Sequence, residues 1–365
     1  MMRNNRNYLS SRAKYAGFTL IEFLVASALS LIVIVAAGGT YFMTRQLNAN
    51  AQKRLDVQQN LRNAASLITR DARNAGSFGC FSTSSVVVKA ESEGVGATVG
   101  KFPNFTDAER RQLELDPKKN DGFGLKLISQ AQAQAAGFDL QGIQFKGNAI
   151  AFIYGKGSAS VTDNGIPAPK ADGSASPYTL GTLTVSDYQN EPDISNTVAS
   201  QGELVVSSCN DAFGSKAQSG SNNSITFAAT QADELTKAQR SSGELGVTKL
   251  YASAYVVADV NNVSSLLRYD LNGAGEWQGP QLLAKNVTGI TPMFGYVENC
   301  QNMSDDVSKH NQETFKFTEN LDKADLPAVV RLHVTYRYPE GDQDVDYIIN
   351  ASVRSGSSCS TTLPV

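Results

Sequence analysis

Residues 17–44 read GFTLIEFLVASALSLIVIVAAGGTYFMT and contain one charged side chain, the carboxylate of Glu22. No charged residue occurs from Phe23 to Thr44, and at 1.5 Å per residue a helix over this run is about 33 Å long. The hydrocarbon core of a bilayer is about 30 Å thick, so the run is long enough to cross it. We therefore predict a membrane-spanning helix over about residues 18–44.

The charges on either side of this helix predict its orientation. Residues 1–17 contain no acid and four basic residues, which are Arg3, Arg6, Arg12 and Lys14. The positive-inside rule keeps such a flank in the cytoplasm, so the rest of the chain is expected outside it.

The composition of the 365 residues is that of a globular protein, with 41% hydrophobic and 18% charged residues. It excludes a disordered chain, a collagen and a polytopic membrane protein. A net charge of −3 argues against a surface devoted wholly to nucleic acid. With two histidines in the chain, histidine-based catalysis and a His-rich metal site are not expected.

A secretory signal peptide also begins with basic residues and an apolar run. Here the run exceeds the usual core of about 7–15 residues, and Glu22 lies at its front edge. A charge within a membrane segment costs about 2.5–3.5 kcal/mol on insertion scales, so such a carboxylate usually has a partner. A plain membrane anchor remains the alternative interpretation.

Residues 17–26, GFTLIEFLVA, closely resemble the class III signal of type IV prepilins. The resemblance implies that a prepilin peptidase cuts after Gly17 and methylates the new N-terminal residue, Phe18. It also implies an assembly role for Glu22, whose carboxylate can neutralise the amino group of its own or a neighbouring subunit. Loss of residues 1–17 would change the net charge from −3 to about −7.

An amphipathic pattern extends the predicted helix beyond residue 44. Apolar side chains recur at steps of three and four residues, at Leu47, Ala51, Leu55, Leu61, Ala65, Ile68 and Ala72. Gly76 is suited to end the helix because glycine readily adopts the left-handed conformation. Gly38-Gly39 is either a weak point of the helix or a feature that suits a membrane segment.

We therefore divide the chain into a cleaved leader (1–17), a stem helix (18–76) and a β-rich head (77–365). The predicted fold class is α+β, with an antiparallel sheet in the head. Candidate strands are 143–154, 203–208, 224–229, 249–258 and 264–271. Residues 155–177 and 210–223, rich in Gly, Ser and Ala, are expected to be loops. Thr106 and Glu109 form a capping-box pattern for a short helix over 107–116.

The clearest predicted hairpin joins 328–338 to 344–353. On its first strand Val330, Leu332, Val334 and Tyr336 share one face, and on its second Val345, Tyr347, Ile349 and Ala351 do so. His333 falls on the other face and is expected at the surface.

Cys80, Cys209, Cys300 and Cys359 are predicted to form two disulfides, because the head is expected in an oxidising compartment. Three pairings are possible, and we favour Cys80 with Cys209 and Cys300 with Cys359. A zinc site is the alternative, but the chain has no CxxC pair.

Residues 70–80, RDARNAGSFGC, are similar to the end of the stem helix in PilW-type minor pilins, and residues 203–213 and 328–353 agree with that family. The resemblance is faint over 90–200, where insertions are expected. It implies a complex of minor pilins that primes and caps a filament of the major pilin on an inner-membrane assembly platform. It also implies a head in the periplasm before assembly and on the pilus or cell surface afterwards. The subunit would then support twitching motility, adhesion or DNA uptake. Type II secretion pseudopilins share this architecture.

Three other patterns have weaker functional interpretations. Residues 94–100 are glycine-rich but match no nucleotide-binding fingerprint. Two basic pairs, Arg110-Arg111 and Lys118-Lys119, suit either DNA phosphates or a solvated surface. Asp342, Asp344 and Asp346 suit either calcium or a charged edge strand. Residues 270–276 are expected to form a turn.

No catalytic set, cofactor motif or metal site is evident, so the sequence predicts an assembly protein rather than an enzyme. The alternatives are a tip adhesin or DNA-contacting subunit acting through residues 90–200, and a membrane-anchored hydrolase. The abundant serines form no GxSxG motif, which disfavours the hydrolase.

Overall fold

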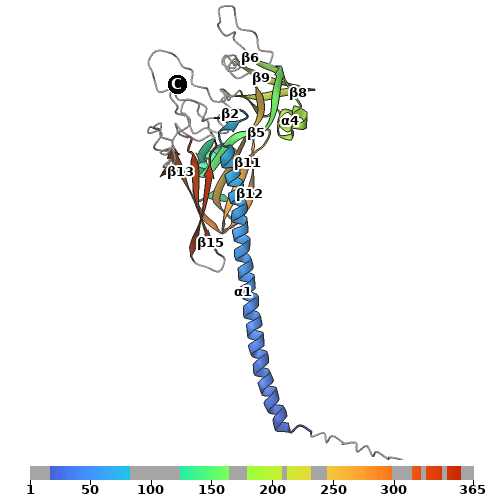
Figure 1. Ribbon diagram of the computed structural model, residues 1–365, viewed down its shortest axis with the longest axis vertical. Helices are drawn as coiled ribbons and strands as arrows, with labels where there is room; N and C mark the ends of the chain where they lie inside the picture. Colours follow the sequence, from blue (N-terminus) through green and yellow to red (C-terminus); the bar gives the residue numbers. More distant parts are fainter. Residues whose placement is uncertain are drawn as a thin grey trace, which may run out of the picture. The chain divides into compact units, whose positions relative to one another are not determined.

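The computed structural model describes residues 17–82, 124–163, 179–207, 212–231, 245–297, 315–321, 326–338 and 343–354 (Figure 1). The chain divides into two compact units, Met1–Asp56 and Val57–Val365. Helix α1 (Leu20–Asn74) forms most of the first unit and continues into the second.

Helix α1 begins and ends close to the predicted bounds. Gly76 has a φ of 75°, and its N–H donates to the carbonyl of Ile153 at 2.9 Å, so the chain leaves the helix directly toward the sheet. Within the described ranges, α1 is the one helix that is long and apolar enough to cross a membrane. Its most apolar window of 18 residues has a mean hydropathy of 2.6 and is not buried in the structure.

Six antiparallel strands of the head form a closed ring. In order around it they are β5 (Ala149–Asp163), β6 (Thr179–Val185), β9 (Ser224–Gln231), β8 (Ala212–Ser221), β7 (Glu203–Ser207) and β10 (Gly246–Val260). Pairing of β10 with β5 closes the ring. A short helical segment, η3 (Tyr188–Asn190), and α4 (Pro192–Ala199) follow β6, and α4 packs against β8. One apolar cluster links the strands and α4, with members such as Leu183, Ile194, Val206 and Phe227.

The long strands β5 and β10 extend this sheet beyond the ring. Strands β11 (Val263–Leu271) and β12 (Trp277–Lys285) continue it from β10, and β3 (Leu125–Ile128) from β5. β4 (Ile143–Phe145) pairs with the end of β10. A hairpin of β1 (Ser77–Phe78) and β2 (Phe81–Ser82) and the short helix α3 (Gln130–Ala135) complete this region.

A second antiparallel sheet has the order β14 (Phe315–Thr318), β13 (Val287–Val297), β15 (Val329–Arg337) and β16 (Asp344–Ser352). The last two strands confirm the predicted hairpin, with Leu332 opposite Ile349 and Val334 opposite Tyr347. His333 lies on the predicted face, but it is half-buried between Thr291 and Ile348.

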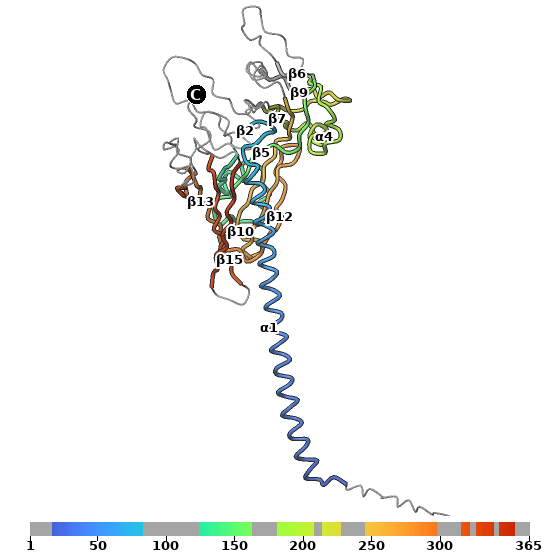
Figure 2. Tube along the Cα trace, in the orientation of Figure 1, coloured from blue at the N-terminus to red at the C-terminus, as the bar shows by residue number. Residues whose placement is uncertain are grey.

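The two sheets bury the last part of α1 between them (Figure 1; Figure 2). Val57, Leu61, Ala64, Ile68 and Ala72 share an apolar cluster with β5, β10, β13 and β15. The apolar stripe therefore packs as predicted from about residue 57 onward. Earlier members of the predicted stripe, Leu47 and Leu55, are exposed.

The predicted loops are wrong over residues 155–163, where β5 continues to Asp163, and over residues 212–221, which form β8. Residues 164–177 lie outside the described residues. Close packing explains Gly155 in β5, and a left-handed φ of 69° explains Gly157. A Cβ on Gly155 would lie 2.6 Å from Thr248 Oγ1 and 3.1 Å from Phe78 Cα, so glycine is needed for the strand to pass. The predicted strand over 143–154 is divided into β4 and β5.

Residues 90–200, where insertions of this chain's own are expected, also include a core strand. β5 pairs with β10 from Ile150 to Ser160 and contributes Phe152 to the core. Deleting 90–200 would therefore remove a central strand. The predicted helix 107–116, the glycine-rich stretch 94–100 and the two basic pairs lie outside the described residues.

Candidate functional site

The residues of the resemblance to prepilins lie together at the start of α1. Phe18 is 91% exposed, and Gly17 has no neighbour within 4 Å of the position a Cβ would take. Both Gly17 and Phe18 precede the helix, and Glu22 lies in its first turn. The peptide bond between Gly17 and Phe18 is therefore in an open, non-helical segment.

Thr19 and Glu22 cap the first turn reciprocally. The N–H and the hydroxyl of Thr19 each donate to Glu22 Oε2 at 3.0 Å, and the N–H of Glu22 donates to Thr19 Oγ1 at 3.3 Å. This is a capping box, and it satisfies two backbone donors that a helix leaves unpaired. Sequence reasoning assigned Glu22 to assembly and missed Thr19, although Thr-x-x-Glu is the signature of this motif.

A buried polar cluster lies at the other end of α1. The Asp71 side chain is fully buried and accepts hydrogen bonds from Tyr154 (2.9 Å), Ser253 (2.8 Å) and Tyr255 (2.6 Å). Arg70 pairs with Asp71 Oδ1 at 3.0 Å, and Arg268 with its Oδ2 at 3.2 Å. We call these six residues the Asp71 cluster. It joins α1 to β5, β10 and β11.

Arg268 connects the Asp71 cluster to Tyr251 and to the partly exposed Asp270. Its NH2 group donates to the hydroxyl of Tyr251 at 2.9 Å, and its Nε lies 2.9 Å from Asp270 Oδ1. Tyr251 in turn donates to the same Asp270 oxygen at 2.7 Å. A buried carboxylate with two guanidinium groups and three hydroxyl donors is well satisfied, as burial of charge requires. Sequence reasoning missed this cluster, because its members are far apart in the chain.

Alkaline pH is expected to destabilise the head through this network. Burial raises the pKa of Tyr154, Tyr251 and Tyr255 above the ordinary value near 10, and the nearby carboxylates raise it further. A raised pKa in the folded state gives stability that is complete below pH 10 and is lost as the pH rises through the folded-state values. Each tyrosine lowers the free energy of unfolding by up to about 1.4 kcal/mol per pH unit in that range.

Urea unfolding followed by circular dichroism between pH 8 and pH 11 measures the slope of the free energy of unfolding against pH. Tyr154→Phe is expected to make it shallower, because one fewer proton is retained on folding. Tyr347→Phe, at a half-buried position of β16, is the matched control. A slope unchanged by Tyr154→Phe would contradict the assignment.

The structure also describes parts of the predicted disulfides and of the aspartate cluster considered as a calcium site. Cys80 is disulfide-bonded, whereas Cys209, Cys300 and Cys359 lie outside the described residues. Asp344 pairs with Arg337 at 2.9 Å and Asp346 accepts from Thr335 at 3.0 Å, while Asp342 lies outside the described part. Across the described ranges, no three His, Cys, Asp or Glu side chains gather as a metal site.

The predicted turn after β11 is confirmed. Asn272 Oδ1 accepts the N–H groups of Ala274 and Glu276, each at 2.9 Å. This turn packs against Gly202, which has no room for a Cβ beside the carbonyl of Gly273.

Comparison with known proteins gives a family for the N-terminal segment. Residues 12–38 match the model of the prokaryotic N-terminal methylation motif. Pilin-like protein PilA3 of Thermus thermophilus is 43% identical over 61 residues. The N-terminal segment of the chain is therefore type IV pilin-like.

The match to PilA3 covers 16% of this chain and 26% of the relative, so the chain spans about a quarter of the curated relative's length. No solved structure matches the chain. Pilin-like proteins are in general structural proteins without enzymatic activity. The long apolar helix and the antiparallel sheets agree with a pilin-like α+β architecture.

Proposed function

We propose that this pilin-like protein is a minor pilin of the PilW type, which enters a type IV pilus through its N-terminal helix and primes or caps the filament. One observation carries the proposal: the methylation motif coincides with the start of a long helix whose apolar side chains are exposed. Exposed side chains of this kind include Ile21, Leu24 and Ile32, at 70%, 57% and 63% exposure. An apolar surface of this extent requires lipid or neighbouring helices to cover it.

Processing would precede assembly in this proposal. The prepilin peptidase cuts after Gly17 and methylates Phe18, and the helix over about residues 18–44 holds the subunit in the inner membrane with its head in the periplasm. The assembly platform then moves the subunit into the pilus, where other minor pilins and the major pilin cover the helix. The head reaches the cell surface and supports motility, adhesion or DNA uptake.

Gly17→Val is expected to block cleavage and leave the precursor in the membrane. The open surroundings of Gly17 offer nothing that clashes with a larger side chain, so the effect arises in the peptidase, which must approach the peptide bond closely. Intact-mass spectrometry of the purified protein measures the outcome. The wild type should start at a methylated Phe18, and the variant should retain residues 1–17.

Gly38→Val is the matched control, because Gly38 is equally open and lies within α1. It should be processed normally. A wild-type N-terminus other than Phe18 would refute the proposed processing.

The PilW-type assignment is separable from a role in type II secretion. Residues 70–80 resemble the PilW-type stem and include Asp71, which holds the helix to the sheets. Affinity capture of the membrane-embedded protein, followed by mass spectrometry, should recover minor pilins of a pilus. Recovery of secretion pseudopilins alone would favour the alternative.

The cysteine pairing belongs to the same proposal. We propose Cys80 with Cys209 and Cys300 with Cys359, which would tie the chain after α1 to the end of β7 and fasten the C-terminal tail. Digestion without reduction and mass spectrometry of the linked peptides tests both bonds. A peptide linking Cys80 to Cys300 or Cys359 would contradict them.

A further inference from the structure

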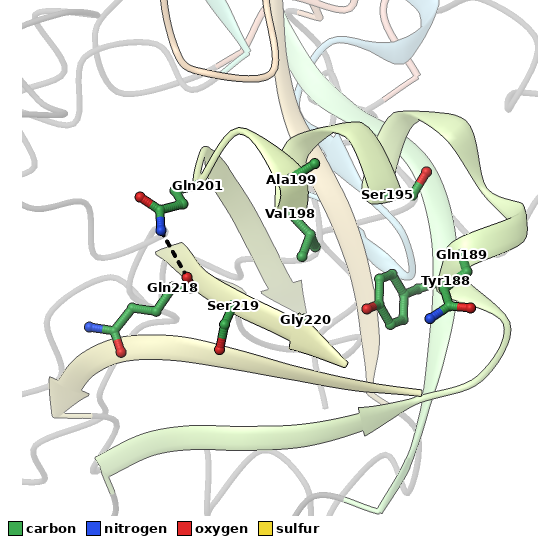
Figure 3. A pocket seen from close by; sticks show the side chains of 9 residues that line it. All are labelled: Tyr188, Gln189, Ser195, Val198, Ala199, Gln201, Gln218, Ser219 and Gly220. Carbon is green, nitrogen blue, oxygen red and sulfur yellow. Dashed lines mark hydrogen bonds between the residues drawn. The ribbon is translucent and has the colours of Figure 1, made fainter. Parts of the chain in front are cut away.

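An open pocket of about 390 Å³ lies between α4 and β8 (Figure 3). Nine residues line it, and none of them carries a charged side chain. Its polar groups come from three glutamines, two serines and a tyrosine, and its apolar groups from Val198 and Ala199. The lining therefore suits a neutral ligand that both donates and accepts hydrogen bonds.

Tyr188 places an unused hydroxyl at the base of this pocket. Its side chain extends from η3 toward β8, and the residue is 4% exposed (Figure 3). The hydroxyl has no hydrogen-bond partner within the described ranges, unlike those of Tyr154 and Tyr255. The Tyr188 hydroxyl is not one of the buried unpaired polar atoms of the described residues, so it reaches solvent in the pocket and is available to donate to or accept from a ligand there.

Gly220 provides the space that this hydroxyl occupies. A Cβ on Gly220 would lie 2.6 Å from Val198 Cγ1 and would also clash with the hydroxyl of Tyr188. Gly220 is in a regular strand and its φ is not left-handed, so the requirement for glycine here is space rather than backbone conformation. The pocket floor thus depends on the lack of a side chain at one position.

Hydrogen bonds hold two of the glutamines at the rim. Gln201 Nε2 donates to the carbonyl of Gln218 at 3.0 Å, and Gln189 Nε2 donates to the carbonyl of Asn222 at 2.6 Å. Each bond fixes an amide plane and leaves its oxygen available as an acceptor. The side chains of Gln218 and Ser219 have no partner in the described part of the chain and add donors.

We propose that this pocket binds a neutral sugar residue of a surface glycan. Sugar hydroxyls donate and accept at the same time, which matches amides and hydroxyls that do the same. The methyl groups of Val198 and Ala199 can contact the C–H groups of a sugar ring. The volume is at the low end of the roughly 300–1,000 Å³ typical of small-molecule sites, which suits one ring rather than a long chain.

Saturation-transfer NMR and titration calorimetry on the full chain test the proposal. The protein should be held in amine-oxide micelles, because maltoside or glucoside detergents would themselves occupy a sugar site. The probes are the methyl glycosides of glucose, galactose, mannose and N-acetylglucosamine. At least one should bind, and Tyr188→Phe should weaken it about tenfold, the effect expected for one lost hydrogen bond.

Two further variants make the result specific. Gly220→Ala should abolish binding because its methyl group displaces the Tyr188 hydroxyl. Gln278→Ala, at an exposed position of β12 outside the pocket, should bind as the wild type does. Circular dichroism establishes that each variant is folded.

Three results would overturn the proposal. They are no binding of any methyl glycoside, unchanged binding in Tyr188→Phe, and binding of a neutral peptide but of no glycoside. Pilus assembly does not enter these measurements, so they are independent of the proposed role in the filament.

Discussion

Asp71→Asn is expected to lower the free energy of unfolding of the head by about 3–5 kcal/mol, the range measured when one partner of a buried charge pair is removed. Asparagine has nearly the same shape, so no cavity forms. Its neutral amide leaves Arg268 buried beside Asp270 alone. It also turns an NH₂ donor toward hydroxyls that donate to Asp71 in the wild type.

Urea unfolding monitored by circular dichroism measures this loss. Asp259→Asn is the matched control, because Asp259 makes an ion pair with Lys146 at 3.1 Å in which the two side chains are 43% and 35% exposed. Exposed pairs contribute about 0–1 kcal/mol, so the control should change stability little. Equal losses in the two variants would show that the Asp71 cluster contributes no more to the free energy of unfolding than an exposed ion pair does.

A double-mutant cycle separates the charge pair from simple packing. Arg268→Leu alone leaves Asp71 buried with Arg70 as its one cationic partner in the described structure. Combining it with Asp71→Asn removes both uncompensated charges. The free energy of unfolding of the double variant should therefore fall by less than the sum of the decreases in the two single variants. Additive losses would indicate two independent packing defects.

Local patterns in the sequence were sufficient to predict the parts of the fold that depend on them. The run without charges and the spacing of Leu61, Ile68 and Ala72 predict α1, and alternation around Leu332 and Ile349 predicts the last hairpin. These signals are periodic within one element. They require no knowledge of what packs against that element.

The errors arise where contacts between distant segments determine the structure. Gly155 and Gly157 resemble loop residues, yet both lie in β5. Thr248 and Phe78 pack directly against Gly155, and Gly157 adopts a left-handed φ of 69° beside Glu191 and Asp193. The Asp71 cluster was missed for the same reason, because contacts between distant segments form it. An aspartate in a charged helical segment is ordinarily at the surface. Nothing in the residues around Asp71 indicates that Tyr255 and Arg268 meet it.

The Thr19–Glu22 capping box gives Glu22 a structural role that is separable from the assembly role proposed for it. As a cap it accepts hydrogen bonds from Thr19, and a glutamine can do the same. In the proposed assembly role, as the partner of the amino group of Phe18 on its own or a neighbouring subunit, it must carry a charge. The two roles therefore predict different outcomes for Glu22→Gln.

We expect Glu22→Gln and Glu22→Ala to reduce incorporation into filaments by on the order of 100-fold, the factor that corresponds to one uncompensated charge among apolar helices. Membrane insertion should remain normal, because loss of the carboxylate makes the segment more apolar. Immunoblots of sheared pili and of membrane fractions measure the two quantities separately.

Thr19→Val is the informative companion variant. It removes the hydroxyl that bonds Glu22 and leaves the charge in place, so it should assemble at close to the wild-type level. If Glu22→Gln assembled normally and Thr19→Val did not, helix capping would be the function of Glu22. Loss of assembly in Glu22→Gln with normal assembly in Thr19→Val would instead assign the function to the charge. A single carboxylate at the edge of an apolar helix then becomes favourable only when a neighbouring amino group neutralises it, which makes its pairing a condition of assembly.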